Sequence, residues 1–225
     1  WYSSRIKLAN CDFRSIGVKN EKMKTIISIA RVLSALFRPV YYPIVGFIIL
    51  FTFTYMSIFP WVFKLWVVVM VYVFTVLLPS VTTHAYSRLR GWRAHELGHR
   101  EKRVVPYAIH LCGYLCCMFI MRDIHLPRFM LAILAVSLLV QAACLLVNLR
   151  WKVSTHSAGA GAVTGALAAY AQLFGFNPVW WLCGCILLCG LVMTSRTILR
   201  RHTLWQVLAG TLLGVLCGYS GIRMM

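Results

Sequence analysis

Two short polar stretches combine histidine, hydroxyl and cationic side chains between apolar segments. Residues 152–156 read Lys-Val-Ser-Thr-His, and residues 195–206 contain Arg196 and His202. Phosphoryl transfer needs such a set: a nucleophile, a proton donor for the leaving oxygen, and fixed positive charge around the phosphoryl oxygens. Neither stretch holds a carboxylate, whereas protein magnesium sites are built on Asp and Glu. The residue types therefore favour metal-independent phosphate chemistry.

The composition indicates an integral membrane protein. Of the 225 residues 60% are hydrophobic and 12% charged, and the mean hydropathy is +0.76, which argues against a soluble globular domain. The net charge of +18 comes from 23 Lys and Arg against 5 Asp and Glu. Because the cations flank apolar segments, we expect the bilayer and a phosphorylated lipid as partners, and no nucleic acid. Most of the nine cysteines lie within apolar runs and are expected to act as small hydrophobic residues.

The apolar runs predict an all-α fold, a polytopic bundle of six to seven transmembrane helices. Each run approaches the length that a hydrocarbon core of about 30 Å requires. The predicted spans are residues 39–57, 62–78, 104–121, 129–149, 157–176, 179–194 and 203–222. Residues 1–38 are expected to form a basic N-terminal extension and an interfacial amphipathic helix, with Met23 as the natural start. Residues 39–222 are then one transmembrane domain, whose second span ends at Pro79.

The order of these spans places the polar stretches on one face of the membrane. Two crossings separate the loop after the second span from the loop after the fourth, and the same holds for the fourth and the sixth. The three loops can therefore converge. The fifth and seventh spans carry small residues four apart that allow close helix packing, namely Gly159, Gly161, Gly165, Gly210, Gly214 and Gly218.

Both polar stretches resemble signatures of the type 2 phosphatidic acid phosphatases (PAP2), which share their core with vanadium haloperoxidases. Ser195-Arg196, five residues and then His202 resemble the third signature, S-R-x5-H-x3-D. Ser154-Thr155-His156 resembles the second signature, P-S-G-H. The resemblance covers roughly residues 79–222. It implies a lipid phosphatase without metal or cofactor, acting on a phosphomonoester or an isoprenoid pyrophosphate through a phosphohistidine intermediate.

The resemblance also implies a role for each residue. His202 would be the nucleophile, and His156 would protonate the leaving oxygen and then activate water. Gln206 stands where the family has aspartate, and its carbonyl can hold the other ring nitrogen of His202 without balancing the charge that grows on the ring. The expected phosphate-binding residues in the two stretches are Arg196, Lys152, Ser154, Thr155 and Ser195.

The first family signature, K-x6-R-P, is matched only in part. Arg103 stands shortly before Pro106, but Glu96 occupies the place of the lysine. We expect Arg103, and after it Arg100, to be further phosphate ligands.

Two other functions remain open from the sequence. His95-Glu96-Leu-Gly-His99 matches H-E-x-x-H, in which two histidines bind zinc and the glutamate activates water, as in a membrane metalloprotease. A third ligand would then have to come from a distant histidine, such as His84, His156 or His202. The departures from the family signatures also allow a catalytically weak lipid carrier or scaffold.

Two arguments give opposite predictions for the side of the membrane on which the polar loops lie. The cations crowd the face with the polar loops, which the positive-inside rule assigns to the cytoplasm. The family resemblance implies an extracytoplasmic active site in a bacterial inner membrane. Because many of these cations would bind substrate phosphate, we favour the second assignment. The sequence identifies neither the lipid nor the oligomeric state.

Overall fold

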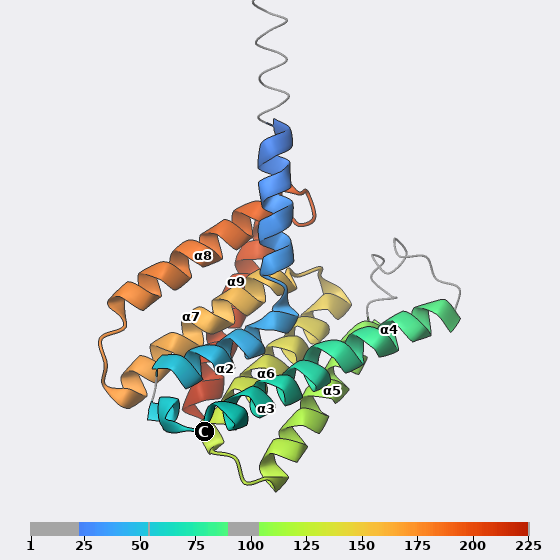
Figure 1. Cartoon of the computed structure of the whole chain (residues 1–225). Coiled ribbons are helices and arrows are strands. Elements are labelled where there is room, and N and C mark those ends of the chain that lie inside the picture. The colour runs from blue at the N-terminus through green and yellow to red at the C-terminus, as the bar shows by residue number, and fades with distance from the viewer. Residues whose placement is uncertain (1–22, 54, 90–103, 225) are drawn as a thin grey trace, which may run out of the picture.

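The structure, a computed structural model, describes residues 23–53, 55–89 and 104–224, and all regular structure in these ranges is helical, as predicted (Figure 1). A helix over residues 23–36, hereafter the N-terminal helix, comes first. The elements after it are η1 (Pro39–Tyr41), α2 (Tyr42–Phe53), η2 (Tyr55–Ile58), α3 (Trp61–Tyr72), η3 (Val73–Leu77), α4 (Leu78–Leu89), α5 (Val104–Asp123), α6 (Arg128–Arg150), α7 (Thr155–Phe174), α8 (Val179–Ile198) and α9 (Leu204–Arg223).

Within the described ranges, six helical stretches are long and apolar enough to cross a membrane, consistent with a multi-pass membrane protein. Each contains part of a predicted span. α7, which covers the predicted fifth span, is not among the six, because its glycine, serine, threonine, histidine and glutamine residues lower its hydropathy. Its buried residues are almost all small, and it packs against α2, α6, α8 and α9. α7 therefore forms the inner helix of the bundle, with the more apolar helices around it.

The second predicted span continues further than the sequence suggested. α3, η3 and α4 form one helical stretch from Trp61 to Leu89, so the expected end at Pro79 is wrong. A proline ring inside an α-helix clashes with the carbonyl four residues earlier. Here the π-helical turn η3 comes directly before α4 and changes the local hydrogen-bond pattern, which lets the chain pass through Pro79.

α7 and α9 run parallel and touch along their backbones. A Cβ built on Gly214 would overlap the carbonyl oxygen of Ala158, and one on Gly218 would overlap that of Ala162, one turn further along both helices. The glycines at 161 and 165 meet α9 in the same way. The predicted small-residue seam is thus one interface between two parallel helices. Because both helices begin at the same end of the bundle, the loops that precede them lie there together.

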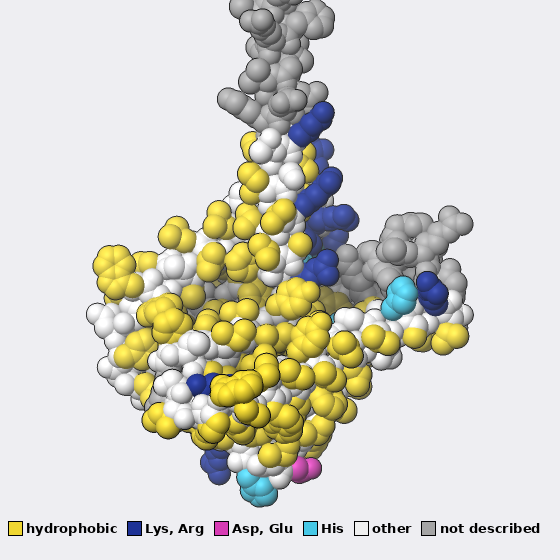
Figure 2. All heavy atoms as spheres, in the orientation of Figure 1, with side chains coloured by type: hydrophobic (Ala, Val, Ile, Leu, Met, Phe, Trp, Pro, Cys, Tyr) yellow, Lys and Arg dark blue, Asp and Glu magenta, His cyan; other side chains and the backbone are white. Residues whose placement is uncertain are grey.

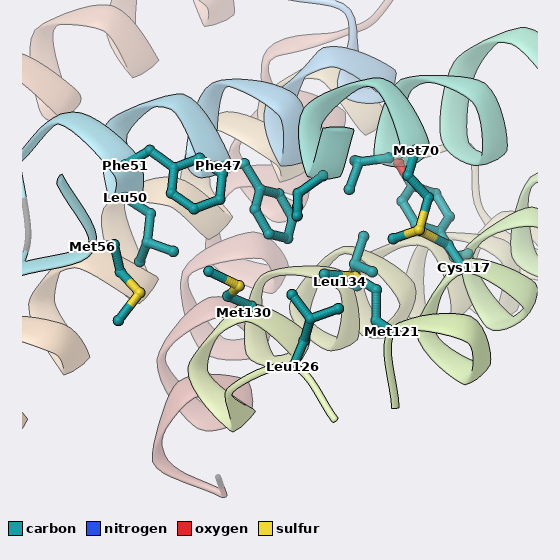
Figure 3. Close-up of a cluster of buried hydrophobic side chains, with 13 residues drawn as sticks. Phe47, Leu50, Phe51, Met56, Met70, Cys117, Met121, Leu126, Met130 and Leu134 are labelled. Atoms are coloured by element: carbon teal, nitrogen blue, oxygen red, sulfur yellow. The ribbon is translucent and has the colours of Figure 1, made fainter. Parts of the chain in front are cut away.

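A second packing centre lies between α2, α3, α5 and α6. Phenylalanine and methionine side chains from α2 and α6 fill its middle, with Met121 of α5 beside them (Figure 3). Many large apolar side chains elsewhere point outward, such as Ile48 at 48%, Leu187 at 70% and Leu212 at 63% exposure, and yellow side chains cover much of the bundle in Figure 2. Such a surface suits contact with lipid chains.

Candidate active site

The loop before α7 and the start of α9 are joined by a backbone hydrogen bond. The N–H of Ser154 donates to the carbonyl oxygen of Gln206 at 3.3 Å. Ser154 is fully buried and caps α7, since its Oγ accepts from the N–H of Ser157 at 3.5 Å. Gly210 makes room for this contact, because a Cβ there would lie 2.6 Å from the carbonyl oxygen of Ser154. The two polar stretches therefore meet, as the order of the spans predicts.

Gln206 fixes the tautomer of His202. Its Oε1 lies 3.2 Å from Nδ1 of His202 and accepts from the backbone N–H of Thr203 at 3.3 Å, as part of a capping box at the start of α9. The N–H of Thr203 can only donate, so the side-chain atom that faces it must be the amide oxygen. His202 then donates its Nδ1–H to the same oxygen. Nε2 of His202 is left with a lone pair, which a nucleophile needs.

The end of α8 turns the chain toward this site. Arg200 has φ of 49°, the N–H of Arg200 donates to Thr197, and the N–H of Arg201 donates to the carbonyl of Arg196. These bonds make a Schellman motif with arginine at the position where glycine is usual. The motif closes the last turn of α8, which carries Arg196, and brings His202 back toward that turn after only a few residues.

Arg196 and His202 both lie close enough to His156 to interact with it electrostatically. Burial lowers the pKa of His156 to about 3, helped by the nearby positive charge of Arg196 and by repulsion from His202 whenever that ring is also protonated. Arg38 acts in the same direction, and the hydrogen bond from the His156 ring to the backbone of Ser34 opposes them. His156 begins α7 and lies outside the six apolar stretches. Without a bound anion, it is therefore neutral near pH 7.

The other predicted site residues fall into three groups. Lys152 and Thr155 are partly exposed beside His156. Ser195 is buried and its hydroxyl donates to the carbonyl of Val192 at 2.8 Å, so it lies inside α8. Arg100 and Arg103, predicted as phosphate ligands, lie outside the described residues, as does the H-E-x-x-H segment at 95–99.

The structure adds a contact that the sequence analysis did not predict. The N-terminal segment reaches the site: Nη1 of Arg196 donates to Oγ of Ser34 at 2.7 Å, and the hydroxyl of Tyr42 donates to the carbonyl of His156 at 3.4 Å. One sequence signal points to it, namely that Lys24, Arg31 and Arg38 recur every seven residues, a spacing that would put them on one face of a continuous helix. The structure ends the N-terminal helix at residue 36, so Arg38 lies just beyond it.

A cavity of about 620 Å³ runs along α7 away from the site. Thr155, Tyr42 and Pro39 line it at the site end, and Phe174 and Trp181 line it at the other end. Its remaining wall is almost entirely apolar and comes mainly from α2, α6 and α7. The 19 residues between the two ends of α7 correspond to about 28 Å of helix. The cavity is therefore suited to a long hydrocarbon chain.

Comparison with known protein families matches residues 64–225 to the PAP2 superfamily. The chain belongs to this superfamily. Searches of curated proteins and of solved structures find no match. PAP2 proteins are generally phosphatases, which agrees with phosphatase-type activity for this chain. The match covers both polar stretches and every helix from α4 to α9, whereas the N-terminal helix and α2 precede it.

Proposed function

We propose that this PAP2 protein is a metal-independent membrane phosphatase that hydrolyses a lipid phosphomonoester or an isoprenoid pyrophosphate through a phosphohistidine at His202. The observation that carries the proposal is the meeting of the two loops. It brings both His202, with its Nε2 lone pair, and Arg196 within electrostatic reach of His156. These are a nucleophile, a proton carrier and a fixed cation at one place.

The first step forms a bond from Nε2 of His202 to phosphorus and breaks the bond from phosphorus to the leaving oxygen. Protonated His156 gives its proton to that oxygen, so the lipid alcohol, or the shorter phosphate from a pyrophosphate, departs neutral at that atom. In the second step, neutral His156 takes a proton from water and the oxygen attacks phosphorus. The N–P bond breaks, inorganic phosphate leaves, and His202 regains its lone pair.

The fixed groups stabilise the transferring phosphoryl group. Arg196 has a planar fork that suits two phosphoryl oxygens, and Ser34 holds it from behind through Nη1. Thr155 and Lys152 lie at the same end of α7, where the helix dipole favours an anion. Because the cavity along α7 begins beside Thr155, a lipid whose phosphate is at the site has a place for its chain. This supports a lipid as the substrate class.

The test uses purified full-length protein in detergent micelles, assayed for phosphate release from phosphatidate, phosphatidylglycerol phosphate and undecaprenyl pyrophosphate. We expect turnover of at least one of these lipids that persists in EDTA and falls with orthovanadate. His202→Ala should abolish release and the acid-labile ³²P label on the protein. His125→Asn is the matched control, because His125 lies in the turn between α5 and α6 with φ of 57°, which asparagine tolerates. Full activity of His202→Ala would refute the mechanism, and activity lost in EDTA would favour a metalloenzyme.

A further inference from the structure

The N-terminal helix is tied to the groups proposed to do the chemistry. Ser34 is buried, its hydroxyl accepts from Arg196 at 2.7 Å, and its backbone accepts a hydrogen bond from the ring of His156. Hydrogen bonds to charged groups are among the stronger ones in proteins. The family match begins only at residue 64, so this segment is outside the part of the chain that the match covers.

A second attachment lies eight residues further along the chain. Tyr42, at the start of α2, donates its hydroxyl to the carbonyl of His156 at 3.4 Å. Its ring lies directly on α7, since a Cβ on Gly159 would overlap ring atoms of Tyr42. The chain between Ser34 and Tyr42 is therefore held against the start of α7 at both ends.

Arg38 lies midway between the two attachments, four residues from each. It ends the connection between the N-terminal helix and η1, and its side chain is exposed. Its backbone carbonyl accepts from the N–H of Tyr41 at 3.0 Å, no hydrogen bond of its guanidinium group to a described residue is found, and its charge reaches His156. Figure 2 shows dark-blue side chains along one side of the N-terminal helix, down to the bundle. Of the three cations Lys24, Arg31 and Arg38, Arg38 is the one whose charge acts on the pKa of His156.

Cations outnumber carboxylates near Arg38 in the described ranges. Asp123 is the one carboxylate in those ranges, and it ends α5 at the opposite end of the bundle from the start of α7. The charges of Arg38 and Arg196 both act on His156, so both guanidinium groups lie within electrostatic reach of its ring. An anion bound beside His156 would be attracted by both cations. A tetrahedral dianion such as phosphate offers enough oxygens for both.

We propose that Arg38 is a phosphate-binding residue and Ser34 a positioning residue for Arg196, so that the N-terminal segment completes the phosphate site. The inference rests on the proposed function for the location of the phosphate, but binding of phosphate can be measured without turnover. It assigns to residues 34–42 a part in substrate recognition that no PAP2 signature quoted above includes.

The experiment measures binding of inorganic phosphate and of orthovanadate to the full-length protein in detergent micelles by isothermal titration calorimetry. Arg38→Ala should weaken binding of both anions about tenfold or more, and Arg38→Lys should recover part of the loss, because the charge remains but the planar fork does not. Ser34→Ala should weaken binding less, because Arg196 keeps its charge. Lys24→Ala is the matched control: it removes a cation of the N-terminal helix that lies ten residues before Ser34, or about 15 Å along the helix, and its affinity should stay within twofold of the wild type.

Each outcome supports or overturns a role for Arg38 in phosphate binding. Affinity of Arg38→Ala within twofold of the wild type would overturn the inference, and so would an equal loss in Lys24→Ala. Thermal unfolding and gel filtration identify a misfolded Arg38→Ala protein. In that case Arg38→Lys is compared with Lys24→Ala, and equal affinities of these two variants for phosphate would overturn the inference. Phosphate binding that depends on Arg38 in a protein that hydrolyses no lipid would refute the proposed function and leave the inference standing. A wild-type protein that binds neither anion would refute both.

Discussion

Phosphate binding is expected to drive proton uptake at His156. In the free protein, burial and the positive charges of Arg196 and Arg38 lower the pKa of His156 to about 3, and His202 acts in the same direction whenever it is protonated. A neutral imidazole cannot protonate a leaving oxygen efficiently, so the proposed general acid needs a proton before the first step. The substrate itself can bring about this change, because its negative charge offsets the positive charges that keep the proton away.

The size of the effect follows from the charges. A dianion about 6 Å from the ring, at an effective dielectric constant of about 20, favours the protonated form by about 5.5 kcal/mol, or about 4 pH units. That would raise the pKa of His156 from about 3 to about 7. At pH 6 the free protein then carries almost no proton at this position. The phosphate complex carries close to one.

Calorimetric titration with orthovanadate or phosphate at pH 6 measures this directly. The binding enthalpy is recorded in several buffers that differ in ionisation enthalpy, and the slope gives the number of protons taken up after correction for the protonation of the anion itself. We expect a corrected value near one for the wild type and near zero for His156→Gln. Equal values in the two proteins would show that His156 does not change its protonation state on binding, and would refute the reasoning.

Two further predictions concern the helix seam and the partner of His202. Gly214→Ala should lower the thermal unfolding temperature in detergent, because the added Cβ overlaps the carbonyl of Ala158 and overpacking costs about 1–3 kcal/mol, whereas Gly184→Ala, with open space around it, should leave it unchanged or higher. An equal loss in both variants would contradict the seam. Gln206→Glu keeps both acceptor contacts but adds an anion that favours protonated His202, so the acidic limb of the pH–activity profile should move to higher pH by about 1–2 units. An unchanged profile would show that this side chain does not act on the nucleophile.

The sequence predicted the parts of the site that depend on local spacing. Gln206 stands four residues after His202, and that spacing predicted their contact, which the structure confirms at 3.2 Å. His202 precedes the N-cap Thr203, so the contact forms as the Gln206 side chain folds back in the capping box and not along a helical face. The parity of the spans predicted that the two loops share a face, and the hydrogen bond from Ser154 to Gln206 confirms it. Both predictions needed only the spacing of residues and the length of a membrane span.

Contacts between segments far apart in the sequence could not be predicted from spacing in the same way. The contact of Ser34 with Arg196 joins residues 162 positions apart, and no periodicity in either segment specifies it. The end predicted at Pro79 failed for a related reason, because the π-helical turn η3 that accommodates the proline packs against α5, where Gly113 lies against the backbone of Phe74. In both cases a tertiary contact decided the local structure.

The side chains that hold Arg196 and His202 in place are both electrically neutral. Ser34 holds Arg196 through a neutral hydroxyl, and Gln206 holds His202 through a neutral amide. A carboxylate in either place would form an ion pair and compete with phosphate for the same cation. With neutral partners, neither Ser34 nor Gln206 sets a negative charge against the cations that act on His156. We therefore expect the substrate to supply negative charge to the site, and the same event to protonate His156 so that it can act as the proposed acid.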